Sequence, residues 1–322
     1  MGSTKEKIIK LAKNKGQVSP SGLVQKLGIS RQAIHRHLND LVEGGKLKKT
    51  GKPPKVFYKI KKDEEVFTSD LSEDIKKVIS ENFLHITPSG KNLVGVEGFN
   101  SWCNERDLPV KKTGKEYINT LKKYNEYKKD GIIDATEKLK DTFEEVFVDE
   151  AFYLDFYSIE RFGKTKLGKM LLYAKQSQNK NLIKELIEEI KPRVKRFVED
   201  KSVDAIGFVS PTVKREVQLI KELEKELSFT NPKLSLLKVT SEVAVPQKTL
   251  SKLEDRVENA QETFIVDDER KFKTVLLIDD AMGSGSTVNQ IAKKIKKQKV
   301  AKKVLAICLV GSFSGFEVIS EV

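Results

Sequence analysis

The sequence predicts an α/β fold in the last part of the chain, with a doubly wound parallel sheet, preceded by a small helix-rich domain and a mostly helical middle region. Apolar runs at Val203–Val209, Val275–Ile278 and Val304–Val310 alternate with amphipathic helical patterns, as in parallel strands that are buried on both faces. The start of the chain has signals for the beginning and end of helices, and it lacks such apolar strand runs. The expected parts are residues 1–62, 63–150 and 151–322.

The first part should contain three helices and a hairpin. Ser19-Pro20 is a cap followed by proline, which is a typical helix start, and Ser30 can cap a helix over Arg31–Glu43. A pair of glycines follows that helix and ends it. The expected strands of the hairpin are Lys46–Lys49 and Lys55–Ile60.

The net charge of +13 lies in the first part of the chain. Residues 1–62 contain sixteen basic and three acidic residues, whereas basic and acidic residues balance in the rest. A basic head on a neutral body predicts a nucleic-acid contact at that end. The alternative, a lysine-rich surface that only aids solubility, would not explain why the excess is concentrated there.

The phrase L-G-I-S-R-Q-A-I-H-R-H-L-N-D-L and the hairpin after it resemble the winged helix-turn-helix domain of many prokaryotic transcription regulators, over about residues 4–61. The resemblance implies binding to double-stranded DNA, with a recognition helix at base edges in the major groove and hairpin lysines on phosphates. A winged helix used for protein contacts is the alternative. The predicted DNA contacts are Arg31, Gln32, His35, Arg36, Lys48, Lys49, Lys52 and Lys55.

The middle region offers no catalytic constellation. After a linker at residues 61–70, helical periodicity runs to residue 150, and Trp102 and the nearby tyrosines are most simply explained as core. This region could be a spacer, a dimerisation element or a cap over the last domain. A homodimer is therefore one expectation.

Composition argues against several classes of protein. The apolar runs are too short to cross a membrane, and the start of the chain lacks the apolar region of a secretion signal. Cys103 and Cys308 lie far apart, which argues against a disulfide framework and a zinc cluster. We expect a cytoplasmic protein without membrane contacts.

Three elements are expected between the apolar strands. A helix from about Asn181 to Val198 should be kinked or split at Pro192, because proline removes a helical hydrogen bond. A second helix is expected over Glu216–Leu227 and a further strand at Leu234–Val239.

The most informative stretch is Val275–Thr287, which reads V-L-L-I-D-D-A-M-G-S-G-S-T. Its strand should end at Asp279 and Asp280, and the small-residue loop Gly283–Thr287 should lead into a helix from Val288. Backbone N–H groups can converge on a phosphate in such a loop, at the positive end of a helix. Two carboxylates beside it suit ribose hydroxyls or a divalent cation. The alternative is a turn with capping serines.

This stretch resembles the phosphoribosyl pyrophosphate (PRPP) motif of type I phosphoribosyltransferases. P-Q-K-T-L-S-K-L-E-D-R-V-E-N-A-Q-E-T-F at Pro246–Phe264 resembles a segment of ComF-type proteins, a branch of that superfamily, with one extra residue between Ser251 and Arg256. G-K-T-K-L-G-K-M-L-L-Y-A-K at Gly163–Lys175 is similar to the stretch that precedes the ComF catalytic core and ends in a lysine. The resemblance implies a type I phosphoribosyltransferase fold for residues 151–322.

The chain departs from the ComF pattern in two places. The arginine-rich stretch with R-G-F-N-Q after the first strand of the core is reduced here to Arg215 and Gln218. The ComF cysteine cluster is missing. Gly283 also occupies the place at which relatives that add purine bases often carry an acid, so the loop shows no general base.

The resemblance implies a site for each part of the substrate. It assigns Asp279, Asp280 and Arg256 to catalysis, and Asp279 and Asp280 to a magnesium ion that accompanies PRPP. The implied PRPP-binding residues are Asp279, Asp280, Gly283, Ser284, Gly285, Ser286, Thr287, Lys214 and Arg215.

Two functions remain open. The first is a magnesium-dependent phosphoribosyltransferase that transfers ribose 5-phosphate from PRPP to a nitrogen base and is fused to a DNA-binding domain. The second is a regulator that senses PRPP or a nucleotide without turnover, because purine-operon repressors join a winged helix to a phosphoribosyltransferase-like domain. A part in DNA uptake or processing is a third, weaker idea.

Overall fold

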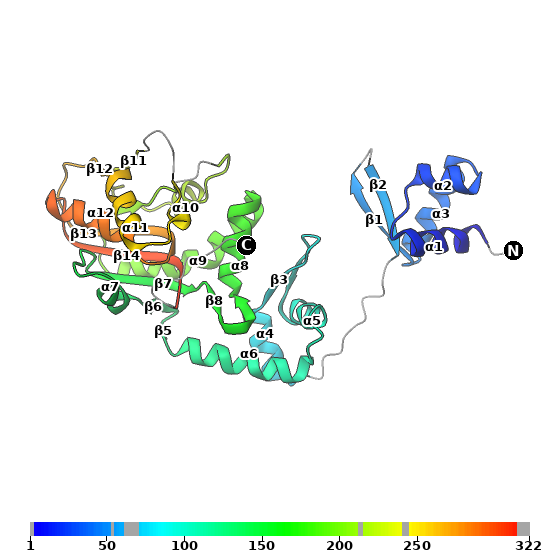
Figure 1. Cartoon of the computed structure of the whole chain (residues 1–322), viewed down its shortest axis with the longest axis horizontal. Helices are drawn as coiled ribbons and strands as arrows, with labels where there is room; N and C mark the ends of the chain where they lie inside the picture. The colour runs from blue at the N-terminus through cyan, green and yellow to red at the C-terminus, as the bar shows by residue number, and fades with distance from the viewer. Residues whose placement is uncertain (1–2, 53–54, 61–70, 212–214, 240–244, 314–322) are drawn as a thin grey trace. The chain divides into compact units, whose positions relative to one another are not determined.

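The computed structural model describes residues 3–52, 55–60, 71–211, 215–239 and 245–313 (Figure 1). Contacts divide the chain into two compact units, Met1–Thr68 and Ser69–Val322. Among the described residues, no helix combines the length and the apolar character that a membrane span needs.

Side-chain caps define the helices of the first unit. Ser19 Oγ accepts a hydrogen bond from the Gly22 N–H at 3.1 Å, and Ser30 Oγ accepts one from the Ala33 N–H at 3.2 Å. The two strands of the hairpin pair antiparallel, and Val18 pairs with Tyr58 beside them. The elements are α1 (Thr4–Lys15), α2 (Pro20–Leu27), α3 (Arg31–Glu43), β1 (Leu47–Lys52) and β2 (Lys55–Ile60).

The second unit is built on a six-stranded sheet in the order β10-β13-β14-β7-β6-β5. The first four of these strands run parallel, and β6 and β5 extend the sheet as antiparallel strands. The strands are β5 (Lys128–Lys129), β6 (Ile132–Asp134), β7 (Glu150–Phe156), β10 (Ala205–Phe208), β13 (Phe272–Met282) and β14 (Ala301–Gly311).

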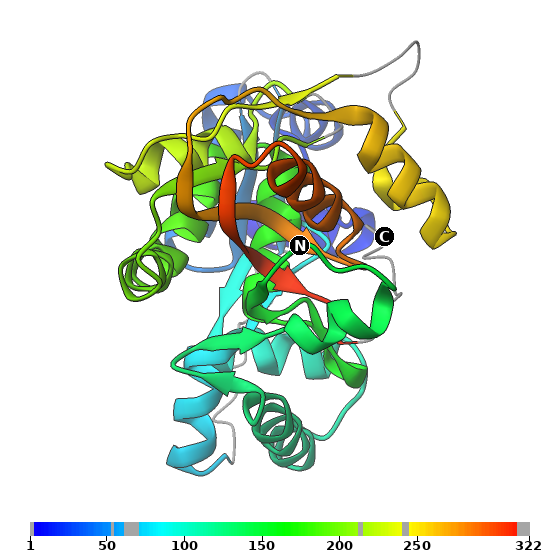
Figure 2. The same ribbon diagram turned by 90° about the vertical axis from the view of Figure 1, so that its left-hand side faces the viewer.

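Helices cover both faces of this sheet (Figure 2). Leu276 and Ile278 of β13 pack into the cluster that contains the apolar faces of α8, α9 and α10. Val275 and Leu277 point the other way and pack with the apolar face of α12. The mostly parallel, doubly covered sheet is the predicted α/β arrangement. The helices are α8 (Lys166–Ser177), α9 (Lys180–Asp200), α10 (Leu219–Leu227), α11 (Leu253–Thr263) and α12 (Ser286–Lys297).

The middle region packs onto the sheet as part of the same unit. Phe83, Phe99, Trp102 and Tyr117 form an aromatic core in which ring centroids lie 5.0–6.2 Å apart. This core belongs to the same apolar cluster as one face of the sheet, so no gap in the packing separates residues 71–150 from the rest of the second unit. The elements are α4 (Glu73–Asn82), β3 (Leu84–Ile86), β4 (Asn92–Val94), α5 (Gly95–Asn104), α6 (Val110–Asn125) and α7 (Thr136–Thr142).

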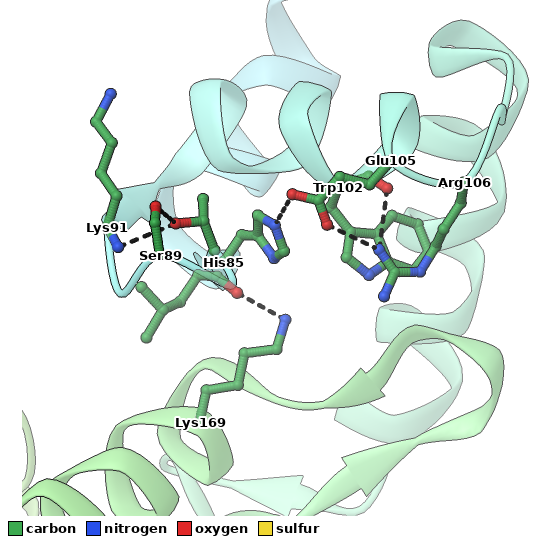
Figure 3. A network of polar contacts seen from close by, with 9 residues as sticks. His85, Ser89, Lys91, Trp102, Glu105, Arg106 and Lys169 are labelled. Carbon is green, nitrogen blue, oxygen red and sulfur yellow. Dashed lines mark hydrogen bonds and ion pairs between the residues drawn. The ribbon is translucent and has the colours of Figure 1, made fainter. Parts of the chain in front are cut away.

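The β3-β4 hairpin holds helix α8 in place (Figure 3). Lys169 Nζ donates a hydrogen bond to the Leu84 carbonyl at 2.6 Å, and its ammonium lies 4.6 Å from the Phe83 ring centroid. His85 Nε2 lies 2.8 Å from Glu105 Oε1 in the same network. Burial lowers the pKa of Lys169 to about 8.

Several expected elements differ from the observed ones. Strand β13 continues through Asp279 and Asp280 to Met282, because its pairing with β14 continues that far. Helix α12 begins at Ser286, inside the predicted loop. Helix α9 is not split at Pro192, since buried residues on both sides of the proline hold it on the sheet.

The strand expected at Leu234–Val239 touches the main sheet only at its start, where the Leu234 N–H donates to the Ile206 carbonyl of β10 at 2.8 Å. Its observed part, β11 (Leu236–Lys238), pairs antiparallel with β12 (Phe264–Val266) in a separate ribbon. The remaining short elements are β8 (Ser158–Ile159), η1 (Glu160–Phe162), β9 (Gly163–Lys164) and η2 (Gln247–Thr249).

Candidate functional site

A cavity of about 230 Å³ lies at the carboxyl ends of β10 and β13. Open α/β sheets bind ligands at this edge. The structure brings together at this cavity residues that the sequence separates by more than a hundred positions. The predicted site residues that line it are Arg215, Arg256, Asp279, Asp280, Gly283, Ser284, Gly285, Ser286 and Thr287. The remaining predicted residue, Lys214, lies outside the described residues.

The small-residue loop places the start of α12 at the cavity. Gly285 occupies the N-cap position with φ 88°, in the left-handed region that favours glycine. Ser284 Oγ and Ser286 Oγ lie 2.8 Å apart, and the Ser286 N–H donates to Ser284 Oγ at 3.3 Å. Ser286 and Thr287 both line the cavity, so the positive end of the helix dipole borders it.

Packing as well as dihedral angle requires glycine at position 285. A Cβ atom built there would lie 2.2 Å from Leu139 Cδ2 of α7. Leu139 is fully buried, so it has no room to move away. The middle region therefore fixes the shape of the loop.

Replacing this glycine should destabilise the second unit. We expect Gly285→Ala to lower the free energy of unfolding by roughly 2–4 kcal/mol, because the strained φ and the contact with Leu139 add together. Gly90→Ala is the control, since Gly90 lies in the same unit and has a positive φ but no atom within 4 Å of an added Cβ. Denaturant unfolding of both variants checks this. Equal losses would show that the contact with Leu139 contributes nothing.

The two adjacent acids are half-buried at the end of the sheet. Asp280 Oδ2 lies 3.0 Å from Lys175 Nζ in the last turn of α8. Asp279 Oδ1 accepts a hydrogen bond from the Asp280 N–H at 2.7 Å. Burial and the charge of Asp280 raise the pKa of Asp279 to about 7, although Lys175 and Lys238 oppose the shift. The Asp279 carboxyl therefore changes its charge near neutral pH.

Basic side chains outnumber the acids around the cavity. Among the described residues that line it, four are basic, namely Lys175, Arg215, Lys238 and Arg256, and two are acidic. Burial lowers the pKa of Lys238 to about 8, with Asp279 opposing the shift. A net positive cavity suits a ligand with several negative charges, such as a phosphorylated compound.

Sequence reasoning missed two of these cations. Lys175 ends the Gly163–Lys175 phrase, which offered a signal, but nothing in the sequence placed it beside Asp280. Lys238 follows an ordinary apolar run, and its position depends on the ribbon of β11 and β12, which carries its ammonium 4.1 Å from the Phe264 ring centroid.

Arg256 lies on α11 with only 6% of its surface exposed. Its Nε donates to the Leu250 carbonyl at 2.7 Å. Within the described part of the chain, its Nη2 is buried without a hydrogen-bond partner. A buried N–H group without a partner is unfavourable, so a guanidinium that lines a cavity in this state is suited to an anionic ligand.

Arg215 has a structural contact as well as a place at the cavity. Its Nη1 donates to the Lys175 carbonyl at 2.7 Å, which ties the start of α10 to the end of α8. Arg215 therefore orders the backbone that carries Lys175.

The predicted DNA-contacting residues lie on α3 and the hairpin. Ile34 and Leu38 of α3 are buried in the core of the first unit, and the opposite face carries the predicted side chains. His35 is half-buried, and the side chain of Lys52 lies outside what the structure describes. The exposed members are Arg31, Gln32, Arg36, Lys48, Lys49 and Lys55.

Comparison with known proteins identifies the first unit. A family model described as HTH domain matches residues 4–59, so this unit is a helix-turn-helix domain, as predicted, and the match supports DNA binding. A search of curated proteins gave no match.

One solved structure with some similarity is a hypoxanthine phosphoribosyltransferase from Staphylococcus aureus, at 12% sequence identity. The alignment covers 41% of this chain and 69% of that chain, with a TM-score of 0.25. A TM-score this low supports no conclusion about the fold or the function.

Proposed function

We propose that the chain is a DNA-binding regulator whose second unit binds PRPP or a related phosphorylated ribose compound. The observation that carries the proposal is the convergence of a glycine-capped helix start, two acids and four cations on one cavity at the ends of the parallel strands. The type I phosphoribosyltransferase fold is part of the proposal. Its support is the helix-covered parallel sheet together with the PRPP-like motif.

The cavity offers a place for each part of such a ligand. The loop at Gly283–Thr287 and the start of α12 would hold the 5-phosphate. Asp279 and Asp280 would accept hydrogen bonds from the ribose hydroxyls. Arg215 and Arg256, which both line the cavity, would meet the pyrophosphate group with their positive charge.

Magnesium stays a prediction, and the structure sets a condition on it. Asp280 already contacts the Lys175 ammonium, so a metal ion that bound both carboxylates would have to displace Lys175. Among the described residues, no group of three or more His, Cys, Asp or Glu side chains is placed to hold a metal. A magnesium ion that accompanies PRPP therefore stays a prediction, with displacement of Lys175 as its condition.

The regulator is tested by measuring DNA affinity with and without the ligand. A ligand alters DNA binding only if it binds one state of the protein better than another, and typical couplings change affinity about 5–150-fold. We expect PRPP to shift the affinity for operator-containing genomic DNA by at least about fivefold. Unchanged DNA affinity at saturating PRPP would contradict the proposal.

Phosphoribosyl transfer is the second candidate, favoured by the buried guanidinium of Arg256. In that reaction the C1–O bond to pyrophosphate breaks, the electron pair leaves with pyrophosphate, and a base nitrogen forms the new bond to C1. The protein would act mainly by positioning and charge stabilisation. Release of pyrophosphate from PRPP in the presence of a nucleobase would favour the enzyme, and its absence with all bases the regulator.

The DNA-binding face has its own prediction. We expect Arg36→Ala to weaken binding to double-stranded DNA by at least about tenfold, because Arg36 is exposed on the recognition helix. Lys13→Ala on α1 is the control, since Lys13 is exposed outside the predicted DNA-contacting set. Fluorescence anisotropy at several salt concentrations gives the affinities. Binding by the unaltered protein that does not change with salt would contradict a phosphate-contacting role.

A further inference from the structure

We propose that Lys175 and Lys238 supply the positive charge that a divalent cation would otherwise bring, so that the second unit binds PRPP without metal. This inference rests on the proposed function and deepens it. Its main support is the ion pair between Lys175 and Asp280, which the sequence motif does not predict.

The helix that carries Lys175 is held in position at several points. Helix α8 is capped by Thr165, whose Oγ1 accepts from the Gly168 N–H at 3.0 Å and donates to the Phe156 carbonyl at 2.7 Å. One turn and a half before the lysine, Lys169 fixes the helix to the Leu84 carbonyl (Figure 3). At the end of the helix, Arg215 binds the Lys175 carbonyl.

The ion pair between Lys175 and Asp280 is partly screened from water. Lys175 and Asp280 are 24% and 13% exposed, and their charged atoms lie 3.0 Å apart. An ion pair screened from water is stronger than one at the surface, and a partly ordered lysine loses less entropy on forming it. Lys175 is therefore an integral part of the acid motif.

Lys238 supplies a second cation on the other side of the motif. Asp279 and Asp280 are consecutive strand residues, so their side chains point to opposite faces of the sheet. Lys175 comes from α8 on the face where Asp280 lies. Lys238 lines the same cavity as Asp279, and its charge opposes the rise in the pKa of that carboxyl. Asp280 thus has an ion pair with a protein cation, and a second cation lines the cavity with Asp279.

The two lysines change the net charge that an incoming phosphate group experiences. The two ammonium groups balance the two carboxylates, so the acids do not repel an incoming phosphate. Arg215 and Arg256 then remain as net positive charge for the anion. Magnesium is bound reluctantly without its waters, and it would have to replace an ammonium already in contact with Asp280.

The experiment is a calorimetric titration of the full chain with PRPP, once with magnesium and once with EDTA. We expect the two dissociation constants of the unaltered protein to agree within about threefold. Binding that is more than about tenfold weaker in EDTA would overturn the inference while leaving the proposed function intact. An absence of binding in both buffers would instead defeat the proposed function.

Variants of Lys175 test the residue itself. We expect Lys175→Met to bind PRPP at least about tenfold more weakly in EDTA and to recover affinity on addition of magnesium, because both carboxylates then become available to the metal. Lys175→Arg should keep metal-free binding, since it retains the charge. Lys184→Met, at an exposed site on α9, should behave as the unaltered protein in both buffers.

A merely structural lysine gives a different result. In that case Lys175→Met would weaken PRPP binding equally with and without magnesium. That outcome would overturn the inference that Lys175 takes the place of a metal ion. Thermal unfolding of each variant identifies one that does not fold. If a variant does not fold, the titrations of the unaltered protein with magnesium and with EDTA still decide the inference.

Discussion

Asp279→Asn should abolish ligand binding and at the same time stabilise the protein at about pH 8. The carboxylate lines the cavity and is the acceptor we assign to the ribose hydroxyls, so its loss should weaken PRPP binding at least about a hundredfold. An asparagine still accepts the Asp280 N–H that the carboxylate accepts now. Local structure should therefore persist.

The gain in stability follows from the direction of the pKa shift. The folded-state pKa of Asp279 is raised to about 7, above the unfolded value near 4, so the folded protein keeps this proton to higher pH. Stability from this group is present below about pH 4 and is lost as pH rises towards 7. An amide cannot ionise, so the variant does not suffer this loss.

Thermal unfolding across pH checks this prediction. Above about pH 7 we expect a gain on the order of 2 kcal/mol, roughly 4–8 °C in Tm for a unit of this size, and almost none near pH 4. Asp200→Asn, at an exposed position at the end of α9, should show neither effect. A variant that bound PRPP normally, or that melted at a lower temperature at about pH 8, would refute the role given to Asp279.

Arg256→Met should also weaken PRPP binding strongly while changing the stability of the protein little. One guanidinium nitrogen is buried without a partner, so removing it should cost little stability beyond the hydrogen bond to the Leu250 carbonyl. The same change removes a charged donor from the cavity. We expect PRPP affinity to fall about 30–100-fold, as for the loss of a charge-assisted hydrogen bond.

Arg193 provides a matched control for this arginine. It is partly buried, and its Nη1 donates to the Leu154 carbonyl at 3.0 Å and the Gly131 carbonyl at 3.3 Å, away from the cavity-lining set. Arg193→Met should therefore lower Tm and leave PRPP affinity unchanged. Calorimetry and thermal unfolding of both variants give the comparison. The opposite pattern, with Arg256→Met less stable and fully able to bind, would make Arg256 structural.

Local signals were enough to predict much of the fold. Helix α3 has the predicted ends, since the Ser30 cap and the following glycine act within a few residues of them. The cores of β13 and β14 were predictable because a strand buried on both faces must be apolar throughout. Pro192 does not split α9 as one of the expected alternatives had it, since proline affects its own helix turn while the stability of α9 comes from packing on the sheet.

Contacts between distant segments were beyond the reach of the sequence. The loop that holds Gly285 was predictable from its small residues, but Leu139, which requires glycine there, lies nearly 150 positions earlier. The same holds for Lys175, whose ion pair with Asp280 depends on how α8 packs on the sheet. The two acids were recognisable because they are adjacent in the sequence. The cations near them come from α8 and β11, which the sequence does not link to the acids.

The antiparallel strands at the end of the sheet cover an edge of β7 that would otherwise be open. Ile133 and Asp134 of β6 pair with β7, whose Ala151–Leu154 segment is buried. If the chain were cut near residue 150, β7 would become a long apolar edge with unsatisfied backbone groups. Such an edge recruits strands from other molecules and leads to aggregation. We therefore expect a chain that begins near residue 150 to aggregate, because the residues before the cut no longer cover β7.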